Sequence, residues 1–260
     1  MKKTIRHLMF AKLAVCMLLA FMLPSCNNGV RDLNDIKEEG VLRVAMGYNP
    51  LGYYHKKDSV TGVQYEMVNA LCNHMGVKAE IEMEADIDLC IEGLKKGKYD
   101  LVARLIPVTT ELKESVQFTS PICLDKQVLV QRKRNAADQN VPYIKSQLEL
   151  PGHHISMPKN SPYIARLKNL AQEIGDTIQI DEIDNYQSEQ LIILVAKGDL
   201  DYTVCNYNLV KRIGNKYPQL DYNTAISFSQ MQAWALNKSS EKLLQEVNNW
   251  IDANSEKYFK

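Results

Sequence analysis

The feature that most constrains the fold of this chain is an alternation of strand-like and helix-like stretches that occurs twice. The first series has strand patterns at 41–46, 77–83 and 99–108, separated by helix patterns at 62–76 and 86–97. The second series has strand patterns at 153–157, 177–183 and 201–205, with helix patterns at 160–175, 188–198 and 206–214. Strands that alternate with helices predict largely parallel sheets covered by those helices. Two series of similar size therefore predict an α/β protein with two lobes.

The predicted helices carry ordinary start and stop signals. Asp86 and Ser188 stand where N-terminal caps are expected. Ser161 is expected to cap a helix whose first residue is Pro162, and Gly175 to end it.

The connection between the two series bears on where a ligand would bind. No low-complexity linker separates them, and the last segment, 231–251, predicts one more strand and a helix capped near Ser239 or Ser240. Two lobes without a flexible linker suggest a hinge and a cleft. Ligands of open α/β sheets bind beyond the carboxyl ends of the strands, so binding residues are expected there.

The N-terminus has the pattern of a secretory signal. A basic start, "MKKTIRH", precedes the eleven apolar residues "LAVCMLLAFML", too few to span a bilayer as a helix, which takes about 20. The following "LPSC" resembles a bacterial lipobox, which implies that residues 1–25 are removed and Cys26 is acylated. The alternative is a secreted protein with an incidental cysteine. Residues 26–40 then predict a tether and a first short helix.

Charge argues against nucleic acid as a partner. The leader contains four basic residues, so the mature chain has 27 basic residues and 31 acidic ones. It is weakly acidic and lacks the basic stripe expected of a nucleic-acid-binding protein. The local run "QRKR" (131–134) is interpreted as a solvated strand end.

Cysteines and histidines give no sign of a metal or a redox motif. The four cysteines of the mature body are scattered, with no CxxC pattern, and we interpret them as buried free thiols: Cys72, Cys90, Cys123 and Cys205. His153 and His154 are adjacent on a predicted strand and point to opposite faces. The sequence lacks the GxSxG, HExxH and Walker motifs. We therefore expect no metal, no cofactor and no enzymatic activity.

Two short stretches are candidates for ligand contact. "NSPY" (160–163) opens a predicted helix and offers free backbone amides and the hydroxyl of Ser161, a suitable anion site, although plain capping is the commoner use. "YNPLGYYHKKDS" (48–59) brings Tyr48, Tyr53 and Tyr54 into a loop after the first strand. These rings either line a pocket or pack among themselves.

The order of several stretches resembles the family 3 extracellular solute-binding proteins, which bind polar amino acids for uptake. The stretches are "GVLRVAMGYNPLGYY", "TGVQYEMVNALCNHMGVKAEI", "GKYDLVARLIPVTTELKESVQFTSPI", "QVLVQRK" and "VAKGDLDYTVCN". "KGDLDYTVCNYNLV" and "GYNPLGYY" are most similar to the N-terminal, solute-binding-like module of membrane-bound lytic transglycosylase F. There a lysozyme-like catalytic domain follows. The chain stops at Lys260, so we expect none here, and we interpret the Glu114-Ser115 dipeptide as a helix-surface pair rather than a catalytic one.

The resemblance also implies the arrangement of the lobes. Lobe one is expected at about 31–121 plus 232–260, and lobe two at about 126–227. Two crossings, near "PICLD" and "SFSQM", would form the hinge of a periplasmic-binding-protein-like, Venus-flytrap fold that closes on its ligand.

The chain departs from the family at both charged anchors for an amino acid. The family commonly has T-x-E-R after the strand at 99–108, where its arginine holds the ligand carboxylate. This chain has Thr109, Thr110, Glu111 and then Leu112. The family aspartate that receives the ligand ammonium is Asn206 here. A ligand with an acid but no free ammonium is therefore favoured over a free amino acid.

Arg104 interrupts the apolar run of its predicted strand and needs a partner, because an unpaired buried guanidinium is costly. Strict alternation would point Ala103 and Leu105 to the opposite face. One interpretation is a structural ion pair with Asp100 or Glu111. The other is that Arg104 replaces the missing family arginine and grips an anionic group of the ligand.

The candidate ligand-binding residues are thus Tyr48, Tyr53, Arg104, Thr109, Thr110, Ser161 and Asn206. Two functions remain open beside a fold kept only as a protein-interaction surface. The first is a lipid-anchored extracytoplasmic binding protein for a small polar, carboxylate-bearing solute, working with a transporter permease or a signalling partner. The second is a regulatory module that senses amino acids or muropeptides or binds a cell-wall enzyme.

Overall fold

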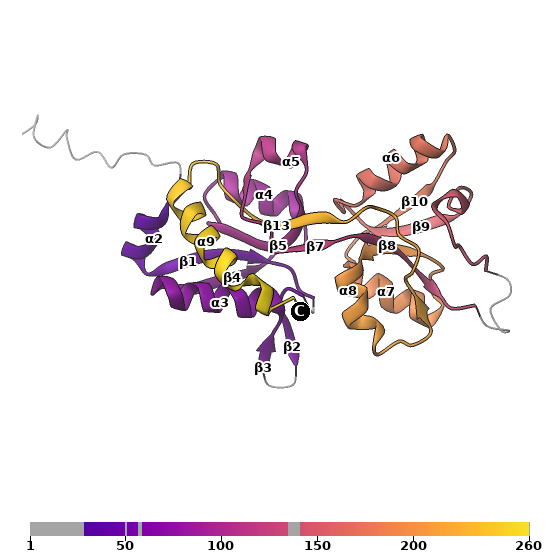
Figure 1. Ribbon diagram of the computed structural model, residues 1–260, viewed down its shortest axis with the longest axis horizontal. Coiled ribbons are helices and arrows are strands. Elements are labelled where there is room, and N and C mark those ends of the chain that lie inside the picture. Colours follow the sequence, from indigo (N-terminus) through magenta and orange to yellow (C-terminus); the bar gives the residue numbers. More distant parts are fainter. Residues whose placement is uncertain (1–28, 50, 57–58, 135–140, 260) are drawn as a thin grey trace, which may run out of the picture.

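The computed structural model describes residues 29–49, 51–56, 59–134 and 141–259, and Cys26 lies outside these ranges. The described chain forms two lobes side by side, joined by strands that run between them (Figure 1). We call them lobe one, built on the sheet that contains β1, and lobe two, built on the sheet that contains β9. The predicted two-lobe α/β fold is confirmed.

Lobe one has the sheet order β4-β1-β5-β13-β6, with β7 also paired to β13. Its strands are β1 (Val41–Met46), β4 (Lys78–Met83), β5 (Leu101–Pro107), β6 (Gln117–Phe118), β7 (Cys123–Asp125) and β13 (Gln230–Leu236). Strands β4 and β5 run parallel to β1, whereas β13 is antiparallel to its three neighbours. A small hairpin of β2 (Tyr54–Lys56) and β3 (Ser59–Thr61) extends from this lobe.

Helices cover both faces of the lobe-one sheet, which is why its central strands are apolar on both sides. The helices are α2 (Leu33–Glu39), α3 (Val63–Met75), α4 (Ile87–Lys95), α5 (Thr110–Ser115) and α9 (Glu241–Asn254), followed by a short 3-10 turn at Ser255–Lys257. Apolar residues of α2, α3 and α9 belong to one core cluster, and those of α4 to another beneath the opposite face. Glu114 is exposed on α5, as predicted.

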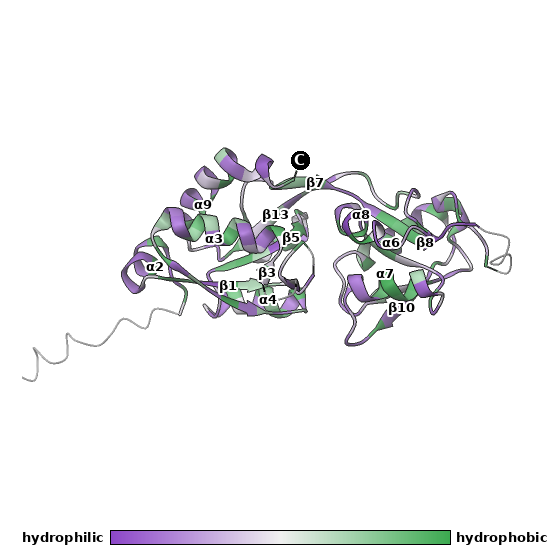
Figure 2. Ribbon diagram, turned by 90° about the horizontal axis from the view of Figure 1, so that it is seen from below, coloured by the Kyte–Doolittle hydropathy of each residue, from purple (hydrophilic) through white to green (hydrophobic). Residues whose placement is uncertain are grey.

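Lobe two repeats this design with the sheet order β10-β9-β11-β8-β12. Its strands are β8 (Gln127–Arg132), β9 (His154–Pro158), β10 (Gln179–Ile183), β11 (Thr203–Asn206) and β12 (Leu220–Asp221). The helices are α6 (Ile164–Ile174), α7 (Ser188–Lys197) and α8 (Tyr207–Gly214), with a 3-10 turn at Gln147–Glu149. Figure 2 shows the hydrophobic residues concentrated on strands such as β8 and on the inner helix α7.

Two chain crossings connect the lobes. The first leads from β7 directly into β8, and the second returns from lobe two into β13. The crossings are paired with each other, since Gln230, Met231 and Gln232 stand opposite Asp125, Leu124 and Cys123. The hinge is therefore a short antiparallel ladder rather than two independent loops.

Helix starts follow the predictions only in part. Asp86 caps α4 and Ser240 is the N-cap residue of α9, as predicted. Helix α6, however, begins at Ile164 with Tyr163 as its N-cap residue, so Ser161 and Pro162 lie in the preceding turn and that prediction is wrong. The cap of α7 is Gln187, not Ser188, because Gln187 and Gln190 form a reciprocal capping box.

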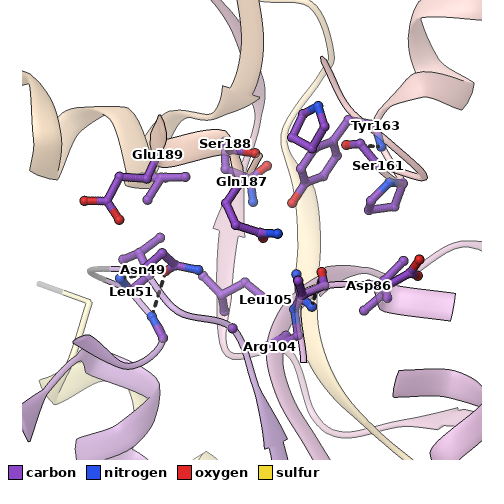
Figure 3. Close-up of a pocket in the computed structure, with 18 of the residues that line it drawn as sticks. Asn49, Leu51, Asp86, Arg104, Leu105, Ser161, Tyr163, Gln187, Ser188 and Glu189 are labelled. Atoms are coloured by element: carbon purple, nitrogen blue, oxygen red, sulfur yellow. Dashed lines mark hydrogen bonds between the residues drawn. The ribbon is translucent and has the colours of Figure 1, made fainter. Parts of the chain in front are cut away.

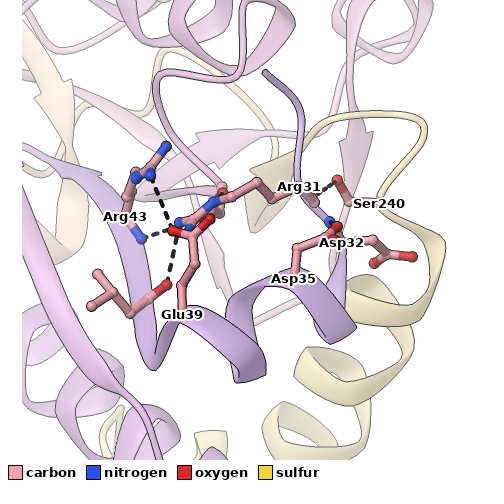
Figure 4. Close-up of polar contacts among 8 residues, drawn as sticks. Arg31, Asp32, Asp35, Glu39, Arg43 and Ser240 are labelled. Carbon is pink, nitrogen blue, oxygen red and sulfur yellow. Dashed lines mark hydrogen bonds and ion pairs between the residues drawn. The ribbon is translucent and has the colours of Figure 1, made fainter. Parts of the chain in front are cut away.

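A buried charged network fixes the N-terminal segment to lobe one (Figure 4). Arg31 is 7% exposed and forms a two-pronged ion pair with Asp100, which is 3% exposed. The Asp100 carboxylate also accepts the Arg43 amide, at 2.7 Å. Arg31 pairs with Glu39 as well, and its carbonyl accepts the Ser240 hydroxyl at 2.8 Å. This network joins β1 and the loop before β5 to the end of α2 and the start of α9.

The four cysteines of the described chain are free thiols, as predicted; Cys72, Cys90 and Cys205 are buried, whereas Cys123 is half-buried. Burial raises the pKa of the Cys72 thiol to about 12, so it stays protonated. Among residues 29–259, apart from the gaps given above, no helix is long and apolar enough to cross a membrane.

Candidate binding site

A pocket lies between the two lobes, beyond the carboxyl ends of strands from both sheets (Figure 3). Lobe one contributes residues that follow β1 and β4 together with part of β5. Lobe two contributes residues that follow β9, β10 and β11. The space between the walls amounts to about 940 Å³, including the open solvent at its mouth. This is where open α/β sheets bind ligands.

Arg104 lies on the lobe-one wall with one side of its guanidinium occupied. Its Nη1 donates to the carbonyl oxygens of Glu84 at 2.8 Å and Ala85 at 2.9 Å. The structure gives Nε and Nη2 no hydrogen-bond partner among the residues it describes. Nε and Nη2 form the edge with which arginine binds a carboxylate through two parallel hydrogen bonds. The guanidinium is thus held from behind and presents a free donor pair.

A bulge in β5 explains how Arg104 reaches the pocket. Ala233 of β13 pairs with Ile106, but Ala235 pairs with Val102, so three residues of β5 stand opposite one residue of β13. A bulge re-aims side chains that strict alternation would place on opposite faces. Ala103, Arg104 and Leu105 all line the pocket, and the prediction that Arg104 alone faces this side does not hold.

Gly47, directly after β1, keeps the arginine accessible. A β-carbon at this position would lie 3.5 Å from Arg104 Nε and 3.6 Å from its Cζ, and 3.2 Å from the side-chain nitrogen of Asn49. Any side chain here would cover the face of the guanidinium. The absence of one leaves room for a ligand against it.

The structural ion pair considered for Arg104 is not what the structure shows. Asp100 is bound by Arg31, and Arg104 donates to backbone carbonyls instead. Asp86 is an acid near Arg104. Burial opposes ionisation of Asp86, but hydrogen bonds from Asn160, Asp88 and Leu89 and the charge of Arg104 together lower its pKa.

A direct hydrogen bond bridges the two lobes at the pocket. The Asn160 side-chain amide of lobe two donates to Asp86 Oδ2 of lobe one at 3.0 Å. Asn160 has a left-handed backbone, with φ of 54°, a conformation that asparagine tolerates better than most residues. The described conformation is therefore one in which the walls touch.

The lobe-two wall combines hydroxyl, amide and carboxylate groups. Burial raises the pKa of the Tyr163 hydroxyl, the charge of Asp125 adds to this, and the Arg104 charge and the Asn206 side chain oppose it. Burial also raises the pKa of Glu189, and the Lys216 charge opposes this. Figure 3 shows Glu189 and Gln187 on the wall that faces Asn49 and Leu105.

The structure brings together three of the seven residues predicted to bind the ligand. Arg104, Ser161 and Asn206 line the pocket, although they come from both lobes. The other four are not among the lining residues. Thr109 caps α5 and Thr110 is exposed on it.

The two tyrosines have different surroundings. Tyr48 is 51% exposed, and Tyr53 packs edge-on against Tyr65, with ring centroids 5.2 Å apart. Neither ring lines the pocket in this conformation. The packing alternative therefore holds for Tyr53, whereas Tyr48 remains exposed.

Sequence reasoning missed several lining residues, among them Gln64, Asp86, Tyr163, Gln187 and Glu189. Asp86 had been interpreted only as a helix cap, and Gln187 and Glu189 had been given no role. Gln64 gave a usable signal, since it is a polar residue on a helix turn where the neighbouring Val63, Met67 and Val68 belong to the core. No group of three or more metal-ligating side chains occurs in the part of the chain that the structure describes.

Comparison with known proteins places this geometry in a family. The sequence profile of the bacterial extracellular solute-binding proteins, family 3, matches residues 41–258. The chain belongs to this family. Solute-binding proteins of family 3 thus include a member whose pocket wall carries Arg104 and Asn206.

Curated relatives of this family-3 protein include membrane-bound lytic murein transglycosylases F. The protein from Aeromonas hydrophila is 29% identical over 206 residues, which are 79% of this chain and 40% of the relative. The protein from Photobacterium profundum is 27% identical over 238 residues, which are 90% of this chain and 45% of the relative. The chain therefore spans less than half the length of these two relatives.

Solved structures with the same fold include amino-acid-binding proteins. An ancestral arginine-binding protein bound to arginine has a TM-score of 0.71 at 23% identity. The superposition includes 85% of this chain and 96% of that protein. The arginine-bound form of the T. maritima arginine-binding protein has a TM-score of 0.72 at 19% identity, covering 85% and 99%. Identities this low establish the two-lobe fold alone.

Proposed function

We propose that this family-3 protein is an extracytoplasmic binding protein whose lobes close on a small polar ligand that carries a carboxylate. The observation that carries the proposal is the free Nε–Nη2 edge of Arg104 in the interlobe pocket. Charge-assisted, two-pronged hydrogen bonds make this edge a carboxylate site. The solved relatives that bind arginine and glutamine indicate an amino-acid-like ligand.

The remaining predicted contacts complete this picture. Ser161 and Asn206 stand on the lobe-two wall and would meet the ligand when the lobes close. Thr109, Thr110, Tyr48 and Tyr53 do not line the pocket in the described conformation and stay predictions. A ligand gripped by Arg104 on one lobe and by these polar groups on the other favours the closed state, because it binds both walls.

A second candidate function rests on the curated relatives. The alignment with two transglycosylases F covers less than half of each relative, but up to 90% of this chain. A regulatory module that senses an amino acid or a muropeptide, or that binds a cell-wall enzyme, would use the same pocket. A permease partner is expected for the first function and a cell-wall enzyme for the second.

The test of the carboxylate site is Arg104→Met, measured by calorimetry after a thermal-shift screen of amino acids, N-acylated amino acids, dicarboxylates and muropeptide fragments. Loss of two charge-assisted hydrogen bonds is expected to weaken binding on the order of 100-fold. The melting temperature should change little, because the site is half-buried. Arg166→Met is a matched control: Arg166 also donates to a backbone carbonyl, at 3.0 Å, but does not line the pocket. Unchanged affinity in Arg104→Met contradicts the proposal.

We also propose that Cys26 is acylated and holds the protein at a membrane. The support is the "LPSC" lipobox after a basic and apolar leader. More than one acyl chain anchors firmly, since each buried methylene contributes about 0.8 kcal/mol. Cys26→Ser should move the protein to the soluble fraction or leave it unprocessed. Unchanged membrane association would remove the anchor from the proposal.

A further inference from the structure

Gln64 places an unpaired hydrogen-bond donor at the pocket. This residue lies in the first turn of α3, is 1% exposed and lines the pocket. Its carbonyl oxygen accepts the indole Nε1–H of Trp234, which is fully buried. An indole nitrogen can only donate, so this bond fixes the orientation of the Gln64 amide. The Nε2 group is left without a partner among the described residues.

Asn206 places an unpaired acceptor on the opposite lobe. It ends β11, is 5% exposed and also lines the pocket. The Asn206 side chain opposes the burial-driven rise in the pKa of Tyr163, which is the effect of an N–H group near the phenol oxygen. Its Oδ1 has no hydrogen-bond partner in the described chain.

A buried polar atom without a partner is unfavourable, so a ligand that forms the missing hydrogen bonds with both atoms gains affinity. Gln64 requires an acceptor and Asn206 requires a donor. Both side chains are neutral, whereas a ligand ammonium would be better served by a carboxylate at position 206. An amide supplies one neutral acceptor and one neutral donor on opposite sides of the group, through its carbonyl oxygen and its N–H.

We propose that Gln64 and Asn206 are specificity-determining residues that select a carboxylate ligand with an adjacent amide, as in an N-acylated amino acid or the carboxyl-terminal residue of a short peptide. This inference rests on the proposed function, in which Arg104 binds the carboxylate. The ligand carbonyl accepts from Gln64 Nε2, and the ligand N–H donates to Asn206 Oδ1.

The test compares three probes that differ at one group: N-acetyl-L-alanine, its ester analogue O-acetyl-L-lactate, and L-alanine. The ester keeps the carbonyl but lacks the N–H. Calorimetry with the intact protein should find N-acetyl-L-alanine bound about tenfold more tightly than the ester, the value of one hydrogen bond of about 1.4 kcal/mol. L-alanine should bind more weakly than N-acetyl-L-alanine.

Variants at the two residues separate their contributions. Asn206→Leu should abolish the tenfold difference between amide and ester, because no acceptor remains for the N–H. Asn206→Asp keeps the shape of the side chain and replaces the leucine variant if that one fails to fold. It should bind L-alanine more tightly than N-acetyl-L-alanine, because the new carboxylate can pair with the ammonium of L-alanine. Gln64→Glu keeps the Trp234 contact, removes the donor, and should weaken amide and ester alike.

The outcomes separate this inference from the proposed function. If N-acetyl-L-alanine and the ester bind equally well to the wild type, or if L-alanine binds most tightly, the amide assignment is overturned while the carboxylate site stands. The amide assignment is also overturned, and the carboxylate site stands, if another carboxylate binds through Arg104 and N-acetyl-L-alanine does not bind. If no carboxylate binds in an Arg104-dependent way, the proposed function fails and the inference fails with it.

Discussion

Two arginines of lobe one, Arg31 and Arg104, have opposite surroundings. Arg31 is 7% exposed, and its donors are bound by Asp100, Glu39 and the carbonyl oxygen of Val41. Arg104 is only partly buried, and its contacts with the described residues are made through Nη1, to two carbonyl oxygens and at 3.9 Å to the Cys90 sulfur. Arg31 is enclosed by its own chain, whereas Arg104 is anchored on one side and open to the cleft on the other.

This difference separates a structural charge from a functional one. A buried guanidinium requires a full set of acceptors, and the chain supplies them to Arg31 from α2, from the start of β1 and from the loop before β5. Two backbone carbonyl oxygens position Arg104, but no carboxylate of the described residues is in direct contact with it. A site prepared for an external anion has this character, since a resident carboxylate would compete with the ligand.

The largest expected effect comes from breaking the Arg31 side of the comparison. Asp100→Asn leaves Arg31 buried beside a neutral amide and should lower the free energy of unfolding by about 3–5 kcal/mol in urea denaturation. Glu39→Gln is the control, because Glu39 belongs to the same network but its side chain is 48% exposed, and it should cost less than about 1 kcal/mol. Equal losses in both variants would show that Arg31 is not held mainly by Asp100.

A second buried acid, Asp125, sharpens the comparison with Asp100, because no arginine of the described residues pairs with it. Asp125 of β7 is 3% exposed, its Oδ2 lacks a partner among the described residues, and burial raises its pKa to about 6. A raised folded-state pKa means that the stability contributed by the protonated form is present below about pH 4 and is lost as the pH rises through 6.

Asp125→Asn should therefore remove this loss. Between pH 4 and pH 7, the variant is expected to gain up to about 3 kcal/mol relative to the wild type, which follows from a shift of about two pH units. Urea denaturation of both proteins at pH 4, 5, 6 and 7 measures it. Parallel pH curves for the two proteins would mean that Asp125 titrates normally.

The smallest expected effect concerns the open edge of Arg104. Gly47→Ala adds a carbon 3.5 Å from Arg104 Nε and should weaken the binding of a carboxylate ligand a few-fold, roughly 0.5–1 kcal/mol, with little change in melting temperature. The new carbon also lies 3.2 Å from Asn49, so Asn49→Ala alone is the control for that loop. Unchanged affinity in Gly47→Ala would show that the ligand does not approach this face.

The sequence predicted the strand and helix order well because those signals are local. Glycine stops, the Asp86 cap and the helical periodicity of α3 all appear within a few residues of each other. It also predicted that Arg104 is exceptional. It failed on what Arg104 contacts, because the partner of Asp100 is Arg31, 69 residues away in the chain.

The parts of the site that escaped prediction depend on tertiary structure. The bulge opposite Trp234 arises from the pairing of β5 with β13, strands more than 120 residues apart, and no pattern within β5 announces it. The role of Gln64 depends on the same Trp234. Glu189 lies in the first helical turn of α7, whose start the sequence predicted, but only the meeting of the two lobes makes it part of a pocket wall.

The position of β13 in lobe one has a consequence for how the chain reaches its fold. This strand lies between β5 and β6, yet it is synthesised after the whole of lobe two. Until residues 230–236 emerge, the edge of β5 is unpaired, and exposed edges promote association with other chains. The chain must also wait for Ser240 and Leu243 before the N-terminal segment is fastened. Lobe two, made of one continuous segment, is free to fold first. The sheet of lobe one is completed only by a strand from the end of the chain, and such non-local pairing is intrinsically slow, which lengthens the interval in which a chaperone would matter.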